Sequence, residues 1–263
     1  MTEVVPPAGP GLYAAERHRH IARKIRANGR LEAAAMAAEL QVTPETIRKD
    51  LTALERQGVL RRVHGGAIAP EGPTTEARID DRSQFADEKA RIARAALEEV
   101  PADGSIFIEV GSTTGMLAEL LPTQRDLVVV TNAPALAVAL AVHPRLTVLS
   151  TGGRVRQRTL GEVDDWALRA LDEIRVDVAF LGTNGIDPEH GLTTPNPAEA
   201  AVKRRMLAAG ARCVLLADHS KIGRVALCRY GDLADVDLLI TDVGLGDEAV
   251  RQLEAVGARV LRV

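Results

Sequence analysis

The sequence predicts an α/β protein: an N-terminal winged helix-turn-helix followed by an open, mostly parallel α/β domain. Two observations lead to this prediction. Three helical segments and a short basic hairpin follow one another within residues 16–70. After them, seven apolar runs alternate with amphipathic stretches, which is the pattern of a parallel sheet with helices on both faces. A chain of 263 residues is long enough for both domains.

Composition divides the chain further. Residues 1–15 are expected to be a disordered tail, residues 71–82 a linker, and residues 83–263 the second domain. Residues 1–70 hold 11 Lys and Arg against 7 Asp and Glu, a net charge of +4, whereas the remainder holds 22 against 29, a net charge of −7. A basic first domain on an acidic body is typical of DNA binding, with chance asymmetry as the alternative.

Several classes of function are not expected. Aromatic residues make up 2% of the chain, too few for platforms that stack single-stranded nucleic acid. Cys213 and Cys228 have the spacing of neither a disulfide framework nor a metal site, so we expect no metal and no cofactor. The N-terminus lacks the order of a signal peptide, and Asn132 and Pro134 interrupt the uncharged residues 127–144. We therefore expect a cytoplasmic protein without a membrane span.

The first two helices are expected at residues 16–27 and 31–40, with Asn28-Gly29 as the stop signal of the first. The third helix is expected to begin at Pro44, which suits the first helical position, with Thr43 as its N-cap.

The third helix has two faces. Ile47, Leu51 and Leu54 form one apolar stripe toward the first two helices. The opposite face carries Glu45, Arg48, Lys49, Thr52 and Arg56. A short turn before the helix places it at the surface, where it can enter a major groove of DNA. A solvated surface is the alternative for this face, and an ion pair to Asp50, Glu55 or Glu45 is the alternative for Arg48, the best candidate for a base contact.

A short basic hairpin follows the third helix. Residues 59–68 carry Arg61, Arg62 and His64 and turn at Gly65-Gly66. The hairpin therefore resembles a wing that contacts phosphates or the minor groove.

This N-terminal order resembles the DeoR-family helix-turn-helix. The resemblance rests on residues 42–51, Leu54-Glu55, Gly58, residues 60–62 and residues 64–67. The family pattern usually has Ser at position 43 and Arg at position 49; Thr43 keeps the hydroxyl, and Lys49 keeps the charge without the bidentate fork. The resemblance implies DNA contacts for Thr43, Glu45, Thr46, Arg48 and Lys49 in the helix, with Thr52 on the same face, and for Arg61, Arg62 and His64 in the wing.

The second domain is expected to contain seven strands. They are residues 105–110, 127–130, 146–149, 176–181, 212–217, 236–240 and 258–263. Loops at the carboxyl ends of parallel strands line the ligand crevice of such a sheet. Residues 111–114 follow a strand and open a helix, so they can hold a phosphate, with an ordinary N-cap as the alternative. Lys221 can meet a phosphate as a point charge, and pairing with Asp218 is the alternative.

Polar or glycine-rich loops follow most of these strands, and one basic residue comes from a helix expected after Pro197. The resulting candidate effector-binding residues are Gly111, Ser112, Thr113, Thr114, Asn132, Gly152, Gly153, Thr183, Asn184, Lys203, Asp218 and Lys221.

This second domain resembles the DeoR-family sensor domain, on residues 87–89, 111–114, 130–132, 182–187 and 218–223 among others. That sensor domain is similar in fold to ribose-5-phosphate isomerase and binds phosphorylated sugars. The resemblance implies a transcription regulator, with repression of a sugar or polyol catabolic operon as the default. Its expected partners are double-stranded operator DNA, a phosphorylated sugar, and further copies of the chain in a dimer or tetramer.

A sugar-phosphate isomerase is the alternative function. Moving a proton between two carbons needs a positioned base. The related isomerases carry carboxylates in a segment similar to residues 181–186, where this chain has Leu181 and Asn184. Asp187 remains, but it suits a turn before Pro188. We therefore expect ligand binding without turnover and no catalytic residue.

Overall fold

The computed structural model describes residues 13–28, 30–56, 59–63, 65–68, 76, 78–79 and 82–263. The chain forms two compact units, Met1–Gly72 and Pro73–Val263. Most of the expected tail and linker lies outside the described residues. The described part of the tail shows that the first helix begins at Ala14, because the amides of Glu16 and Arg17 bond to the carbonyl of Tyr13.

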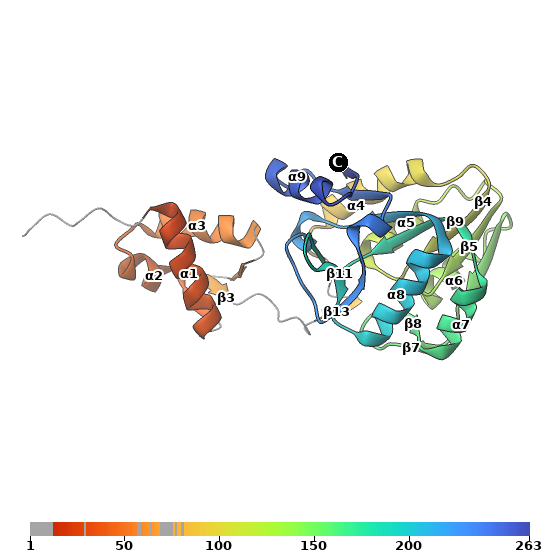
Figure 1. The fold of residues 1–263 in the computed structure, drawn as a ribbon, viewed down its shortest axis with the longest axis horizontal. Coiled ribbons are helices and arrows are strands. Elements are labelled where there is room, and N and C mark those ends of the chain that lie inside the picture. Colours follow the sequence, from red (N-terminus) through yellow and green to blue (C-terminus); the bar gives the residue numbers. More distant parts are fainter. Residues whose placement is uncertain are drawn as a thin grey trace, which may run out of the picture. The chain divides into compact units, whose positions relative to one another are not determined.

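The N-terminal unit combines three helices with a small antiparallel sheet (Figure 1). Its elements are α1 (Ala14–Asn28), β1 (Arg30–Glu32), α2 (Ala33–Glu39), α3 (Pro44–Arg56), β2 (Arg61–Val63) and β3 (Gly66–Ile68). The helix expected at residues 31–40 is wrong at its start. Leu31 belongs to β1 and pairs with Ala67 of β3, because this pairing buries the Leu31 side chain and outweighs local helix propensity.

The apolar stripe of α3 is buried as expected. Ile47, Leu51 and Leu54 are each at most 2% exposed and share one core with α1 and α2. Asp50 is buried beside them. Its carboxylate accepts a hydrogen bond from Arg17 Nε at 2.7 Å and lies 3.0 Å from His18 Nε2. An ion pair thus ties α3 to α1 and holds the outer face of α3 toward solvent.

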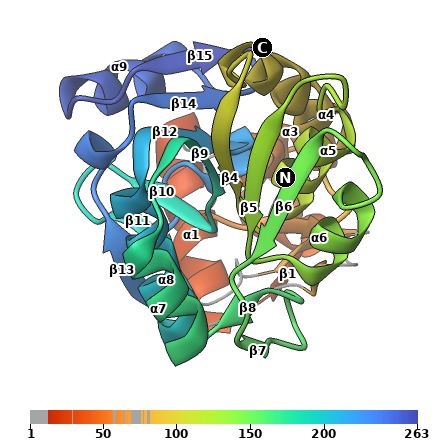
Figure 2. The same cartoon turned by 90° about the vertical axis from the view of Figure 1, so that its right-hand side faces the viewer.

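The C-terminal unit is built on a seven-stranded parallel sheet, and all seven expected strands belong to it (Figure 2). Their bounds are β4 (Gly104–Ile108), β5 (Leu127–Thr131), β6 (Leu146–Ser150), β9 (Val176–Gly182), β12 (Gly210–Leu216), β14 (Leu238–Thr241) and β15 (Val260–Arg262). The order across the sheet is β15-β14-β12-β9-β4-β5-β6. The predicted fold class of an open parallel α/β domain is confirmed.

Helices cover both faces of this sheet. Ile106 and Ile108 of β4 point into one core, where α4 (Ala86–Ala96), α5 (Ser112–Glu119) and α6 (Pro134–Leu140) pack. Phe107, between them, points into the other core with α7 (Asp165–Glu173), α8 (Pro197–Ala209) and α9 (Asp247–Ala255). The alternation of side chains along a strand therefore produces two separate cores.

Short additional strands were not predicted. β10 (Gly185–Asp187), β11 (Gly191–Thr194) and β13 (Cys228–Gly231) form an antiparallel sheet. β7 (Arg154–Val155) and β8 (Glu162–Val163) form a hairpin. The described chain also contains 3₁₀ turns at Leu97–Glu99, His219–Lys221 and Leu233–Asp235. Strands of two to four residues are too short for a periodic signal in the sequence.

The strand order reverses between β4 and β9. From β4 the chain proceeds to β5 and β6 on one side, and then returns to β9, β12, β14 and β15 on the other. Ligands of open α/β sheets bind outside the carboxyl ends of the strands at such a switch point. None of the helices in the described part of the chain is long and apolar enough to cross a membrane.

Candidate nucleic-acid interface and effector site

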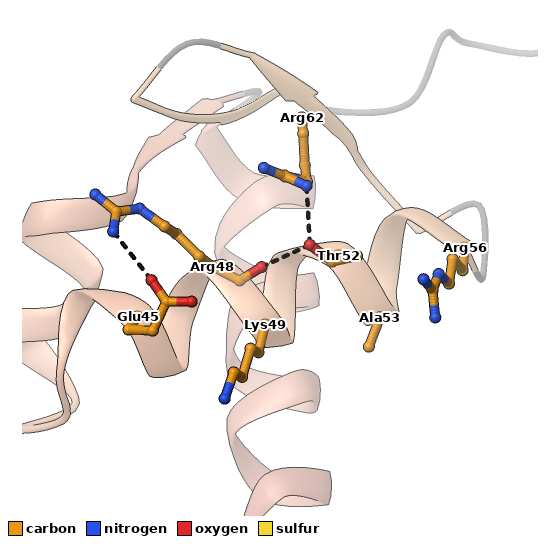
Figure 3. A pocket seen from close by; sticks show the side chains of 7 residues that line it. All are labelled: Glu45, Arg48, Lys49, Thr52, Ala53, Arg56 and Arg62. Atoms are coloured by element: carbon orange, nitrogen blue, oxygen red, sulfur yellow. Dashed lines mark hydrogen bonds and ion pairs between the residues drawn. The ribbon is translucent and has the colours of Figure 1, made fainter.

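The outer face of α3 and one strand of the hairpin form a shallow hollow in the surface (Figure 3). It is lined by Glu45, Arg48, Lys49, Thr52, Ala53, Arg56 and Arg62. Four of these seven side chains are cationic and one is anionic. Five of the residues expected to contact DNA therefore lie together on a surface with an excess of positive charge.

Hydrogen bonds join this surface internally. Arg48 Nη1 lies 3.1 Å from Glu45 Oε2, so one of the alternative ion pairs for Arg48 is present. Both side chains are more than 60% exposed, and a pair so exposed contributes only about 0–1 kcal/mol, so it opens at little cost. Arg62 Nη1 donates to Thr52 Oγ1 at 2.8 Å, and the Arg62 amide donates to Glu55 at 2.7 Å. These bonds hold the hairpin against α3.

The remaining candidates for DNA contact do not line this hollow. Thr43 Oγ1 accepts a hydrogen bond from the Thr46 amide at 3.1 Å, as expected of an N-cap. The two threonine hydroxyls also lie 2.9 Å apart at the exposed start of α3. Arg61 is partly buried on β2, and His64 lies outside the described residues.

In the C-terminal unit, the start of α5 retains free polar groups. Gly111 is its N-cap residue, and no side chain caps the helix, so the alternative of an ordinary cap does not describe it. Thr114 Oγ1 is buried without a hydrogen-bond partner among the described residues. Amides at a helix start carry partial positive charge, and a buried unpaired hydroxyl is costly. Both features favour an anion at residues 111–114.

Two lysines lie close enough to Asp218 to interact with it electrostatically. Lys89, on α4, is 4% exposed, and its ammonium donates to the carbonyl of Arg82 at 2.8 Å. Burial lowers the pKa of Lys89 against the attraction of Asp218. Burial also lowers the pKa of Lys221, and the positive charge of Lys89 adds to that effect. The two ammonium groups therefore lie within electrostatic range of each other, with the Asp218 carboxylate as an anionic neighbour that opposes the lowering of both pKa values.

Sequence reasoning did not assign Lys89 to the site, although α4 packs directly against α5. A lysine within an amphipathic helical pattern reads as a surface charge. Its burial becomes visible only once α4 is placed on the sheet.

Other candidate effector residues already have partners in the protein. Asn132 accepts from the Val110 amide at 2.8 Å, and the Gly152 amide donates to the Glu162 carboxylate at 2.8 Å. The same carboxylate accepts from the hydroxyls of Ser150 and Thr151. Glu162 was not predicted, and it occupies the amide of Gly152, a residue that the sequence suggested for a ligand.

The loop after β9 is similarly bonded. Thr183 Oγ1 donates to the carbonyl of Gly185 at 3.0 Å, and Asn184 Oδ1 accepts from Thr194 Oγ1 at 3.0 Å. Asp218 accepts from the Ser220 amide at 3.1 Å. Gly153 has φ +109°, and a Cβ there would lie 2.5 Å from the carbonyl oxygen of Val163, so the backbone requires glycine.

The switch point between β4 and β9 contains a buried ion pair. Lys203 of α8 pairs with Glu109 at the end of β4 and donates to the carbonyl of Gly182 at 2.9 Å. The Gly182 amide donates to the second oxygen of Glu109 at 2.7 Å. Burial raises the pKa of Glu109, and the Lys203 charge opposes that rise. Lys203 therefore has a structural partner where a ligand contact was expected.

Comparison with known proteins identifies both units. The model of the DeoR-like helix-turn-helix domain matches residues 17–72, and the model of the DeoR C-terminal sensor domain matches residues 84–243. The chain belongs to the DeoR family of transcriptional regulators. The predicted family is thereby confirmed, and a regulator is confirmed over an isomerase, because this family consists of transcriptional regulators.

Relatives match this DeoR-family regulator along nearly its whole length. The HTH-type transcriptional regulator GlpR of Haloferax volcanii is 35% identical over 95% of this chain and 98% of the relative. The glycerol-3-phosphate regulon repressor of Escherichia coli is 31% identical over 86% of this chain and 90% of the relative. Among solved structures, ribose 5-phosphate isomerase A from Neisseria gonorrhoeae is 23% identical, covers 52% of this chain and 53% of that chain, and has a TM-score of 0.38.

His219 of the DeoR sensor domain provides a pH-dependent contact beside Asp218. Its Nδ1 lies 2.8 Å from Asp242 Oδ1, and this bond raises the pKa of His219 above 6.5. The charged pair is thus complete below pH 6.5 and is lost as the pH rises through the raised pKa. We expect an NMR titration to find the His219 pKa above 6.5 and to find it lowered in Asp242→Asn. An unchanged value in that variant would contradict the assignment; His219→Gln identifies the resonance.

Proposed function

We propose that this chain represses a sugar or polyol catabolic operon and that a phosphorylated sugar releases the repression. The observation that carries the proposal is the cationic face of α3, held outward by a buried stripe and joined to the hairpin through Arg62. A helix of this kind reads base edges in the major groove, while the adjoining basic hairpin contacts phosphates.

For DNA, the proposed contacts follow the geometry. Arg48 can leave the exposed pair with Glu45 and donate in a bidentate manner to a guanine. Lys49, Arg56 and Arg62 lie along the same hollow and suit phosphate oxygens. The hydroxyls of Thr43 and Thr46, at the start of α3, and of Thr52 add uncharged contacts, and Arg61 and His64 remain proposed wing contacts. Each neutralised phosphate contributes a slope of about −0.9 to the dependence of log affinity on log salt.

For the effector, the proposed phosphate subsite consists of the start of α5 together with Lys89 and Lys221. Four of the twelve expected residues, Ser112, Thr113, Thr114 and Lys221, make no side-chain hydrogen bond within the described part of the protein and suit direct contact. The other eight position the loops around them. A phosphorylated ligand also agrees with the name of the Escherichia coli relative, a glycerol-3-phosphate regulon repressor.

A symmetric oligomer completes the proposal. Operators of helix-turn-helix proteins commonly have two half-sites, spaced by about 34 Å or multiples of that distance, which match a twofold axis of the protein. A dimer or tetramer would place two α3 helices on such a site. The effector would then act by changing the separation of the two helices, with a coupling of about 1–3 kcal/mol.

The test is retardation of a duplex taken from upstream of the chain's own gene, at low salt, with and without a panel of sugar phosphates. We expect a retarded complex that at least one phosphorylated compound dissolves, while the same compound without its phosphate has no effect. A thermal-shift measurement with the same panel reports effector binding independently, because a ligand selective for the native state raises its stability. Absence of retardation under all of these conditions would refute the proposal.

A further inference from the structure

The described residues of the segment that follows the N-terminal unit are bonded to the sensor domain. Glu76, shortly after the boundary at Gly72, has a side chain only 3% exposed. Its carboxylate accepts from Arg156 Nη2 at 2.9 Å and from Arg82 Nη2 at 3.1 Å. Between Glu76 and Arg82 along the chain, the Ile79 amide donates to the carbonyl of Arg158 at 2.9 Å. The chain leaving the DNA-binding unit is thus held by a buried carboxylate.

This carboxylate is one end of a chain of polar contacts. Arg156 pairs with Glu199 as well as with Glu76. Glu199 in turn accepts from Thr194 Oγ1, which donates to Asn184 after β9. Burial lowers the pKa of Arg156, but hydrogen bonds and charges of the two glutamates outweigh it and hold the pKa above its ordinary value. Arg156 therefore stays charged and keeps Glu76 linked to the loop at the switch point.

The other end of the segment reaches the phosphate subsite. The carbonyl of Arg82 accepts from the Lys89 ammonium at 2.8 Å. Burial is the main cause that lowers the pKa of Lys89 and of Lys221, and the positive charge of Arg82 adds to it in both. The bond to its carbonyl places Arg82 directly beside the Lys89 ammonium, and its guanidinium charge acts on both lysines. It also forms an ion pair with Glu76.

We propose that Arg82 exchanges its ion partner when the effector binds: it leaves Glu76 and pairs with the effector phosphate on Lys89 and Lys221. The inference rests on the proposed function, because it assumes the phosphate subsite described there. Arginine can form a bidentate pair with phosphate, and a phosphate near neutral pH carries up to two negative charges against one on Glu76. The exchange weakens the hold on Glu76 and so loosens the segment that leads to the DNA-binding unit.

The proposed exchange predicts the direction in which each substitution changes the affinity for phosphate. Glu76 and the phosphate compete for Arg82, so removing the Glu76 charge strengthens phosphate binding, and removing Arg82 weakens it. The weaker hold on Glu76 should also weaken the nearby bond from the Ile79 amide to the Arg158 carbonyl, so the Ile79 amide should exchange faster with solvent when phosphate is bound. By reciprocity, any variant that loosens the segment favours the phosphate-bound state.

The experiment uses the full chain and inorganic phosphate as the probe, at constant ionic strength, with affinity measured by calorimetry. We expect Glu76→Gln to bind phosphate about 5–150-fold more tightly than wild type and Arg82→Gln to bind it more weakly. In the Arg82→Gln background, Glu76→Gln should have no further effect. Hydrogen exchange of the peptide containing Ile79 should accelerate in wild type on addition of phosphate.

Glu88→Gln is the matched control, because Glu88 acts on Lys89 by its charge and has no hydrogen bond to Arg82 among those of the described residues. Equal tightening in Glu88→Gln and Glu76→Gln would show a plain charge effect and overturn the exchange. Slower hydrogen exchange at Ile79 with phosphate would overturn the proposed partner exchange as well.

If wild type binds no phosphate, the phosphate subsite of the proposed function fails together with the partner exchange. If wild type binds phosphate and Glu76→Gln binds it equally well, only the partner exchange fails. Should Glu76→Gln not fold, an unchanged phosphate affinity in Arg82→Gln would by itself overturn the partner exchange.

Discussion

Lys203→Met is expected to lower the free energy of unfolding by about 3–5 kcal/mol, because it leaves the buried carboxylate of Glu109 without its counter-charge. Both side chains are at most 6% exposed, so water cannot replace the lost partner. Denaturant unfolding followed by circular dichroism measures the loss. A loss below about 1 kcal/mol would contradict the view that Lys203 is a structural residue.

The loss of stability in Lys203→Met should become larger as the pH rises. Burial raises the pKa of Glu109, and without Lys203 the hydrogen bond from the Gly182 amide is the main interaction left to oppose that rise. The unfolded chain keeps the ordinary pKa of about 4.3. The variant is therefore least destabilised at pH values below that figure, where Glu109 is protonated in both states, and it loses stability as the pH rises.

A double variant separates the charge from the packing. In Glu109→Gln/Lys203→Met neither charge of the pair remains, so we expect most of the stability to return, since replacing both members of a buried pair is often nearly neutral. If Lys203 instead served the effector directly, the single variant would keep its stability and lose only the response to sugar phosphates. The two measurements thus decide between the structural partner and the contact that the sequence suggested.

Arg48→Ala is expected to weaken operator binding by about 5–150-fold, corresponding to the 1–3 kcal/mol of one bidentate base contact. The side chain is 63% exposed and makes no core contact, so stability without DNA should change by less than about 0.5 kcal/mol. Competition between operator and random duplex in a retardation assay measures the effect. Specificity should relax, because non-specific phosphate contacts survive.

Three variants sharpen this prediction. Arg48→Lys keeps the charge without the fork and should recover only the non-specific part of binding. Lys49→Ala should weaken binding to all duplexes alike and reduce the salt slope by about 1 if it contacts one phosphate. Arg251→Ala, which removes an exposed arginine from a similar i,i+3 pair on α9, should leave binding unchanged. Equal losses in Arg48→Ala and Arg251→Ala would argue against α3 as the reading helix.

Many of the helices and strands could be predicted because they depend on patterns within a few neighbouring residues. The inner strands of the parallel sheet are mainly apolar runs, such as residues 127–130, whose side chains are buried or half-buried on both faces. The start of α3 follows from Thr43 and Pro44, whose capping chemistry acts within one turn. Its buried stripe follows from helical spacing alone. None of these three features requires knowledge of distant residues.

The candidate effector site was predicted only in part. Residues 111–114 and Lys221 could be proposed as candidates from their positions after strands, whereas Lys89 could not, because its burial depends on how α4 packs. Glu162 and Glu109 also escaped prediction, because their burial depends on how distant parts of the chain pack around them. A glutamate that accepts hydrogen bonds from each of residues 150, 151 and 152 has no distinguishing pattern in the sequence, yet it decides whether those donors are open to a ligand.

By itself, the sequence determined the two-part organisation, the seven parallel strands and the polar face of α3, since hydrophobic periodicity and capping operate over a few residues. Only the tertiary structure decided that Leu31 lies in a strand, that Lys203 pairs with Glu109, and that Glu76 is buried against Arg156. These three outcomes arise from contacts between residues far apart in the chain. Their energies come from burial and charge pairing, which depend on the assembled fold and leave no periodic trace in the order of amino acids.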